Sequence, residues 1–112
     1  TLVAPFRSLG KVLAGELAPT AADAFCIMTR GHEGDTEAVR FALSTPASYI
    51  GVMGSRRKRE AMFARLAEEG FADARRRVVT PIGLDIAAQT PAEIAVSVAA
   101  QLITWRAAMQ AV

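Results

Sequence analysis

Apolar and polar stretches alternate along this chain with lengths typical of an α/β protein. Three short apolar runs have the length and composition of buried strands: 24–29, 49–53 and 78–80. Segments 35–44 and 55–70 carry apolar residues three and four positions apart, which predicts helices. A last periodic segment starts at Thr90, and its apolar arc is wide enough to predict burial on more than one side. The alternation predicts helices on both faces of a mainly parallel sheet.

The first residues predict two weaker elements, a strand at 2–4 and a glycine-interrupted helix at 8–17. The chain starts with Thr1 instead of methionine, so we expect it to be a processed or excised piece of a longer protein. Its 112 residues suit a single domain, 1–112.

Capping signals mark the predicted helix ends. Asp35 and Ser55 are candidate N-caps, since a short polar side chain can accept a hydrogen bond from the first helical N–H groups. Gly70 stands where a C′ glycine is expected. Thr90 and Glu93 have the spacing of a capping box at the start of the last helix.

The carboxyl ends of parallel strands meet at one sheet edge, where open α/β sheets bind ligands. This edge would collect the polar loop 30–35, the turn at Gly54 and the loop 83–85. The turn at Gly54 gives the strongest indication of an anion site. The helix that starts there has basic residues in its first turn, where the helix dipole favours acidic ones, so these residues are expected to serve a ligand. We therefore predict a phosphate or carboxylate site at Gly51, Gly54, Ser55, Arg56, Arg57 and Lys58. The alternative is a solvated basic helix start.

Composition narrows the function classes. The net charge of +2 conceals two basic clusters, 56–59 and 75–77, but neither is interleaved with the aromatics that stack on bases, so we expect no nucleic acid partner. No long uncharged apolar run predicts a membrane span. The single cysteine, Cys26, excludes an internal disulfide, and without a signal peptide we expect a cytoplasmic protein. Cys26 lies in an apolar strand, which predicts a core thiol.

Two loop residues remain open. His32 could donate a hydrogen bond or carry a proton at the ligand edge, or simply fasten its loop. As the only histidine it argues against a metal site. Asp85 could bind a ligand hydroxyl or fix its turn. No nucleophile, base and orienting group occur together, so a binding protein is favoured over an enzyme.

Four segments together resemble the C-terminal Rossmann-type domain of the XdhC/CoxI family: 28–35, 49–58, 81–86 and 90–95. Members of that family are accessory factors of xanthine dehydrogenase, carbon monoxide dehydrogenase and related molybdenum hydroxylases. The resemblance implies a maturation factor that holds the molybdenum cofactor (molybdopterin), supports its sulfuration and delivers it. A molybdenum hydroxylase apo-enzyme and a cysteine desulfurase would then be its partners.

The chain departs from the family pattern because it has no G-x-G-x-x-G sequence. We therefore expect a partial Rossmann-like fold that lacks the first glycine-rich βαβ unit. An NAD(P)-binding oxidoreductase fragment is one alternative function, although the phosphate fingerprint is absent. A non-catalytic assembly domain is another, and an uncovered edge or helix face would make the protein a homo-oligomer.

Overall fold

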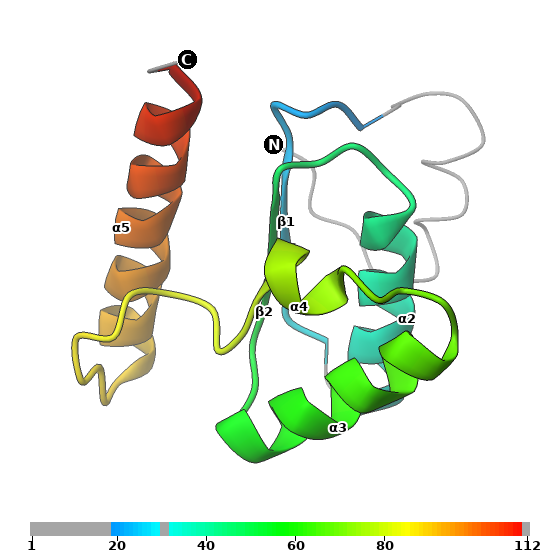
Figure 1. Cartoon of the computed structure of the whole chain (residues 1–112). Helices are drawn as coiled ribbons and strands as arrows, with labels where there is room; N and C mark the ends of the chain where they lie inside the picture. Colours follow the sequence, from blue (N-terminus) through cyan, green and yellow to red (C-terminus); the bar gives the residue numbers. More distant parts are fainter. Residues whose placement is uncertain (1–18, 30–31, 111–112) are drawn as a thin grey trace.

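The computed structural model describes residues 19–29 and 32–110, apart from the side chains of His32 and Glu33. The strand predicted at 2–4 and the helix predicted at 8–17 lie outside this part. Seven elements follow one another along it: β1 (Ala24–Ile27), α2 (His32–Leu43), β2 (Tyr49–Val52), α3 (Arg56–Glu68), α4 (Ala74–Arg77), β3 (Val78–Val79) and α5 (Pro91–Gln110). Figure 1 shows their arrangement.

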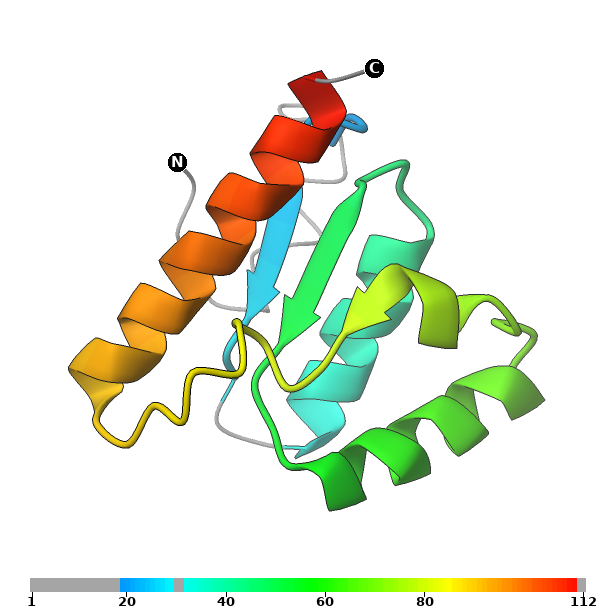
Figure 2. The ribbon, with the colours of Figure 1, turned by 60° about the vertical axis from the view of Figure 1, so that its left-hand side comes forward.

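The three strands form one parallel sheet in the order β1-β2-β3, as predicted. Cys26 pairs with Gly51, and Gly51 with Val79. The central strand β2 is buried along its whole length, whereas β1 buries only Ile27 fully. Figure 2 shows the two longer strands side by side with their carboxyl ends at one edge.

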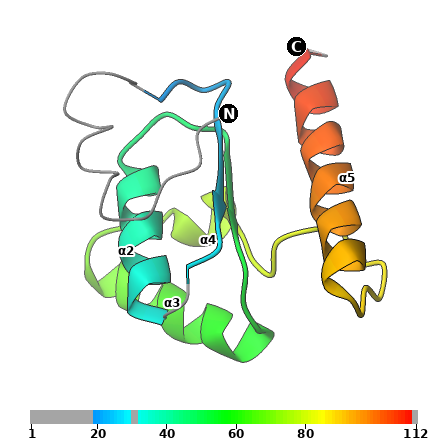
Figure 3. The same ribbon diagram turned by 180° about the vertical axis from the view of Figure 1, so that it is seen from behind.

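Helices cover both faces of the sheet, which confirms the predicted architecture. On one face α2, α3 and α4 pack on Ile27, Ile50 and Val52. On the other face Val98 and Trp105 of α5 pack against Tyr49 and Ile82. Figures 1 and 3 show that, of the described helices, only α5 lies on this face. No helix within residues 19–29 and 32–110 is long and apolar enough to cross a membrane.

The predicted ends of α3 and α5 are confirmed. The Ser55 hydroxyl accepts a hydrogen bond from the Lys58 N–H at 3.2 Å. At the other end Gly70 has a φ of +97°, and the N–H of Phe71 donates to the carbonyl of Leu66 at 2.9 Å. That pattern is a Schellman motif, which glycine favours because a side chain resists positive φ. At the start of α5 the Thr90 hydroxyl accepts a hydrogen bond from the Glu93 N–H, and the Glu93 carboxylate accepts one from the Thr90 N–H.

Three predictions are wrong in detail. Asp35 is not the N-cap of α2, because the helix already begins at His32. Cys26 is exposed and not a core residue, since it lies on β1, which within the described residues pairs on one side only. Helix α5 is not buried on more than one side, because Val96 and Ile103 are 60% and 56% exposed.

Candidate functional site

The carboxyl ends of the strands surround a small hollow at the start of α3. It is lined by residues at the carboxyl ends of β2 and β3 and by the first turns of α2 and α3: Asp35, Val52, Met53, Gly54, Ser55, Lys58, Arg59, Met62 and Thr80. Its volume of about 10 Å³ suffices for roughly one water molecule. A larger ligand would therefore lie over this edge, with only a small group reaching into the hollow.

The start of α3 is suited to an anion. Ser55 is an extended N-cap residue, and it satisfies the N–H of Lys58. The N–H groups of Arg56 and Arg57 have no hydrogen-bond partner within the described residues. The first turn contains no acidic residue, so the positive end of the helix dipole is not neutralised there. A phosphate or carboxylate placed at this corner would meet free donors and positive charge together.

Basic side chains surround that corner, and all three predicted ones are exposed. Lys58 lines the hollow, whereas Arg56 and Arg57 lie outside its lining. None of these three forms an ion pair within the described part of the chain. Their charges are therefore available to a ligand.

Asp35 joins the hollow from α2. Its Oδ1 accepts hydrogen bonds from the backbone N–H and the hydroxyl of Thr29, at 3.1 and 2.6 Å. The carboxylate thus ties the end of β1 to the first turns of α2, so Asp35 fastens this loop but does not cap the helix. The backbone of His32 starts α2, while its side chain lies outside the described residues, so its proposed role stays a prediction.

The two predicted glycines have different surroundings. Gly54 is exposed at the hollow, where the nearest neighbour of an added Cβ would be the Thr80 hydroxyl at 3.9 Å. Gly51 is buried, and an added Cβ would lie 2.6 Å from Ile82 Cδ1 and 2.7 Å from the Tyr49 hydroxyl. Gly51 therefore permits close packing on the α5 face, and ligand approach is possible only at Gly54.

Asp85 lies in the exposed loop between β3 and α5, away from the lining of the hollow. Its carboxylate makes no hydrogen bond within residues 19–29 and 32–110. The structure thus unites Gly54, Ser55 and Lys58 but leaves Asp85 apart, and a ligand contact by Asp85 stays a prediction.

Thr80 and Arg59 are polar residues of the hollow that were not among the predicted site residues, although Arg59 belongs to the basic cluster 56–59. Thr80 follows β3 and is buried beside Gly54. Arg59 lines the hollow, and its Nε is buried without a hydrogen-bond partner in the described structure. Its guanidinium carbon is 5.7 Å from the centroid of the Phe63 ring. Thr80 is the last residue of the predicted strand 78–80, and this position at the carboxyl end of a strand was the available signal.

The second basic cluster is structural in part. Arg77 donates hydrogen bonds to three backbone carbonyls, those of Leu43, Thr45 and Ala47. Arg75 forms a two-bond pair with Glu60, and this pair lowers the pKa of the glutamate. Only Arg76 remains without a side-chain partner among the described residues.

Comparison with known proteins identifies the group to which these motifs belong. Residues 4–102 match the sequence profile described as the XdhC Rossmann domain. The chain belongs to that family. The resemblance predicted from the loop motifs is thereby confirmed, and so is the Rossmann-like fold.

Two relatives place this XdhC Rossmann domain among longer proteins. It is 34% identical over 82 residues to the uncharacterized protein YqeB of Escherichia coli (strain K12), a match that spans 72% of this chain and 15% of YqeB. It is similar to the crystal structure of a protein from Bacillus halodurans that is named a xanthine dehydrogenase, with 31% identity and a TM-score of 0.69. That match covers 90% of this chain and 27% of the solved one. The chain thus spans a minor part of each relative's length.

Proposed function

We propose that this XdhC domain serves the maturation of a molybdenum hydroxylase of the xanthine dehydrogenase type by holding the molybdenum cofactor. Two findings support this function. The chain belongs to the XdhC Rossmann domain family. Its sheet also carries, at the edge where Rossmann-like folds bind ligands, a helix start with free N–H groups and unpaired basic side chains. The second finding carries the proposal, because it offers a phosphate-binding corner.

The residues at this edge fit a phosphorylated pterin. The cofactor's phosphate would be held by the N–H groups of Arg56 and Arg57 and by the ammonium of Lys58. Met28 and Met53 are 52% and 40% exposed, and the Met53 N–H donates to the Ile27 carbonyl, which brings the two methionines to neighbouring strand ends. Their thioether side chains offer an adaptable apolar surface for the flat ring. The cofactor supplies the molybdenum chemistry, and this chain's residues bind and orient it.

In this proposal the domain acts as a chaperone and not as an enzyme. A cysteine desulfurase would supply sulfur while the cofactor is held, and the apo-enzyme would receive the finished cofactor. The hollow accommodates only about one water molecule, so most of a bound cofactor would stay outside it and accessible to such partners.

Isothermal titration with molybdopterin and with inorganic phosphate tests this function. The double variant Arg56→Ala/Lys58→Ala removes two positive side chains from the start of α3. Lys58 lines the hollow, and Arg56 lies beside it. We expect at least about tenfold weaker binding of both ligands, since the lost charge-assisted hydrogen bond of Lys58 alone contributes roughly 1.5–3 kcal/mol. The double variant Arg65→Ala/Arg106→Ala removes the same charge from exposed positions elsewhere on α3 and α5 and should bind normally. Equal affinities of the two double variants would contradict the proposed site.

A non-catalytic assembly domain is the second candidate. The observation that favours it is the uncovered apolar surface of α5, where Val96 and Ile103 are more than half exposed. Such a face suits a second copy of the chain or a larger partner. Native mass spectrometry distinguishes the candidates. A retained pterin supports the maturation role, a retained NAD(P) supports the oxidoreductase alternative, and a multiple of the subunit mass without ligand supports assembly.

A further inference from the structure

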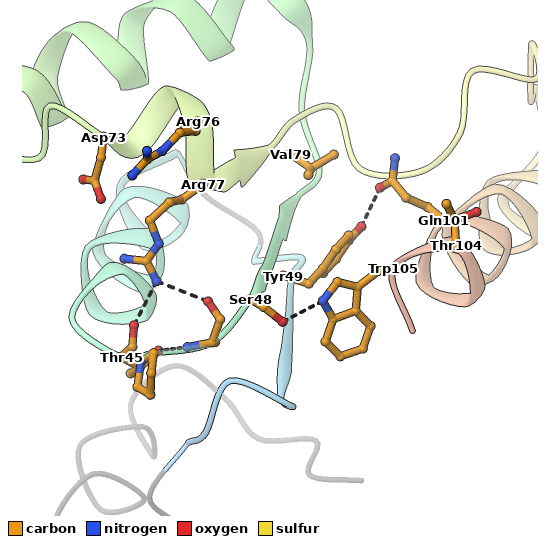
Figure 4. A pocket seen from close by; sticks show the side chains of 12 residues that line it. Thr45, Ser48, Tyr49, Asp73, Arg76, Arg77, Val79, Gln101, Thr104 and Trp105 are labelled. Atoms are coloured by element: carbon orange, nitrogen blue, oxygen red, sulfur yellow. Dashed lines mark hydrogen bonds between the residues drawn. The ribbon is translucent and has the colours of Figure 1, made fainter. Parts of the chain in front are cut away.

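A second concavity lies at the opposite, amino-terminal end of the sheet. It is an open groove of about 800 Å³ between α5 and the segment of α4 and β3, closed at one end by the connection from α2 to β2. Figure 4 shows its side chains. The lining combines aromatic, basic, acidic, amide and hydroxyl groups, among them Tyr49, Asp73, Arg76, Gln101, Thr104 and Trp105. None of these residues belongs to the hollow at the carboxyl edge.

Two aromatic rings form one side of the groove, and Trp105 is held in a fixed orientation. Its indole N–H donates to the Ser48 hydroxyl at 2.7 Å. The Tyr49 and Trp105 ring centroids lie 5.9 Å apart at an interplanar angle of 53°. The indole's only donor is already used, so a further ligand would meet Trp105 through its ring.

The polar groups of the α5 wall leave donors free. The Tyr49 hydroxyl donates to Gln101 Oε1 at 2.5 Å, and the Gly83 N–H donates to the same oxygen at 2.9 Å. The acceptor of this amide is therefore occupied. Its Nε2 group has no hydrogen-bond partner within the described residues, although it can donate twice. Figure 4 shows this nitrogen on the side away from Tyr49.

The α4 wall adds a positive charge. Arg77 is engaged with the backbone carbonyls of the α2–β2 connection, but the guanidinium of Arg76 is exposed and unpaired within the described part. Asp73 lies on the same wall, three residues before Arg76. Its carboxylate makes no capping hydrogen bond to α4. Because like charges repel, this acidic group disfavours a ligand with several negative charges. The wall thus favours an anion with a single charge.

We propose that this groove binds a small molecule that combines a planar aromatic ring with one carboxylate. The ring would lie against the half-buried ring of Trp105, and the carboxylate would accept hydrogen bonds from Arg76 and from Gln101 Nε2. A volume of about 800 Å³ is in the range of small-molecule sites. This ligand class differs from the phosphorylated pterin proposed for the other edge of the sheet, so the two sites are independent.

Tryptophan fluorescence provides a direct test, because Trp105 is the only tryptophan of the chain. The 112-residue protein is titrated with 3-phenylpropionate, with its uncharged amide, and with butyrate, which has no ring. We expect saturable quenching by 3-phenylpropionate and about tenfold weaker binding of the other two. Arg76→Gln should weaken the binding of 3-phenylpropionate about tenfold, since it removes a charge-assisted hydrogen bond.

Arg106→Gln is the matched control, because Arg106 is also an exposed helical arginine without an ion pair in the described structure, and it lies outside the lining of both the groove and the hollow. It should bind 3-phenylpropionate like the unaltered chain. Equal binding of the acid and its amide would overturn the proposal, as would full affinity in a folded Arg76→Gln variant. The melting temperatures of both variants establish that they are folded.

Discussion

Gly51→Ala should destabilise the protein although it adds a single methyl group. The new Cβ would lie 2.6 Å from Ile82 Cδ1, 2.7 Å from Ile82 Cγ1 and 2.7 Å from the Tyr49 hydroxyl. Real Cβ contacts are longer than 3.0 Å, so these groups would have to move. Both neighbours are buried, at 7% and 3% exposure, and Tyr49 is also held by Gln101. Overpacking of this kind costs about 1–3 kcal/mol.

Urea denaturation followed by circular dichroism measures this loss as a lower midpoint at an unchanged slope. Gly54→Ala is the matched control, because its φ is not positive and its added Cβ would have the nearest neighbour only at 3.9 Å. That variant should be as stable as the unaltered protein or more stable by up to about 1 kcal/mol, since alanine restricts the unfolded chain. Equal stability of the two variants would refute the packing role of Gly51.

Two further predictions concern titration. Burial raises the pKa of Tyr49, the only tyrosine, to about 12, so phenolate absorbance should titrate near that value in the folded protein and near 10 in urea. The associated stability is complete below about pH 10 and is lost as the pH rises through the folded value; a native midpoint near 10 would contradict it. Hydrogen bonds from the Gln89 and Thr90 N–H groups lower the pKa of Glu93 in the folded protein. The stability that Glu93 adds to the fold is therefore present above the unfolded pKa of this group, and it is lost as the pH falls through the folded pKa. Glu93→Gln should reduce the loss of thermal stability on acidification, and an unchanged pH profile would count against this.

Local signals predicted much of the fold because their physics is confined to a few residues. Ser55, Gly70 and the pair Thr90 and Glu93 each act within one helical turn, and all are found as predicted. The start of α2 was missed for the opposite reason. Asp35 resembles an N-cap in sequence, but its carboxylate bonds to Thr29 across the connection from β1, so the helix begins earlier.

Exposure could not be predicted from the apolar pattern alone. Cys26 and Val96 have apolar neighbours in the sequence, and their exposure follows from which strands and helices lie beside them. The candidate site was predicted in part. Its cap and basic residues are consecutive, whereas Thr80 and Asp35 reach the hollow through the parallel arrangement of separate strands. The bond from Tyr49 to Gln101 joins residues 52 positions apart, which no local signal reports.

The three hydrogen bonds of Arg77 also limit how the chain can be altered by insertion. They hold the connection from α2 to β2 at its Leu43, Thr45 and Ala47 carbonyls, so an extra residue there would misplace acceptors that one planar guanidinium binds together. The loop from 84 to 89 is mostly exposed and has no such clamp in the described structure. Insertions, tags or grafted segments should therefore be placed in the loop 84–89, and the connection from α2 to β2 should keep its length.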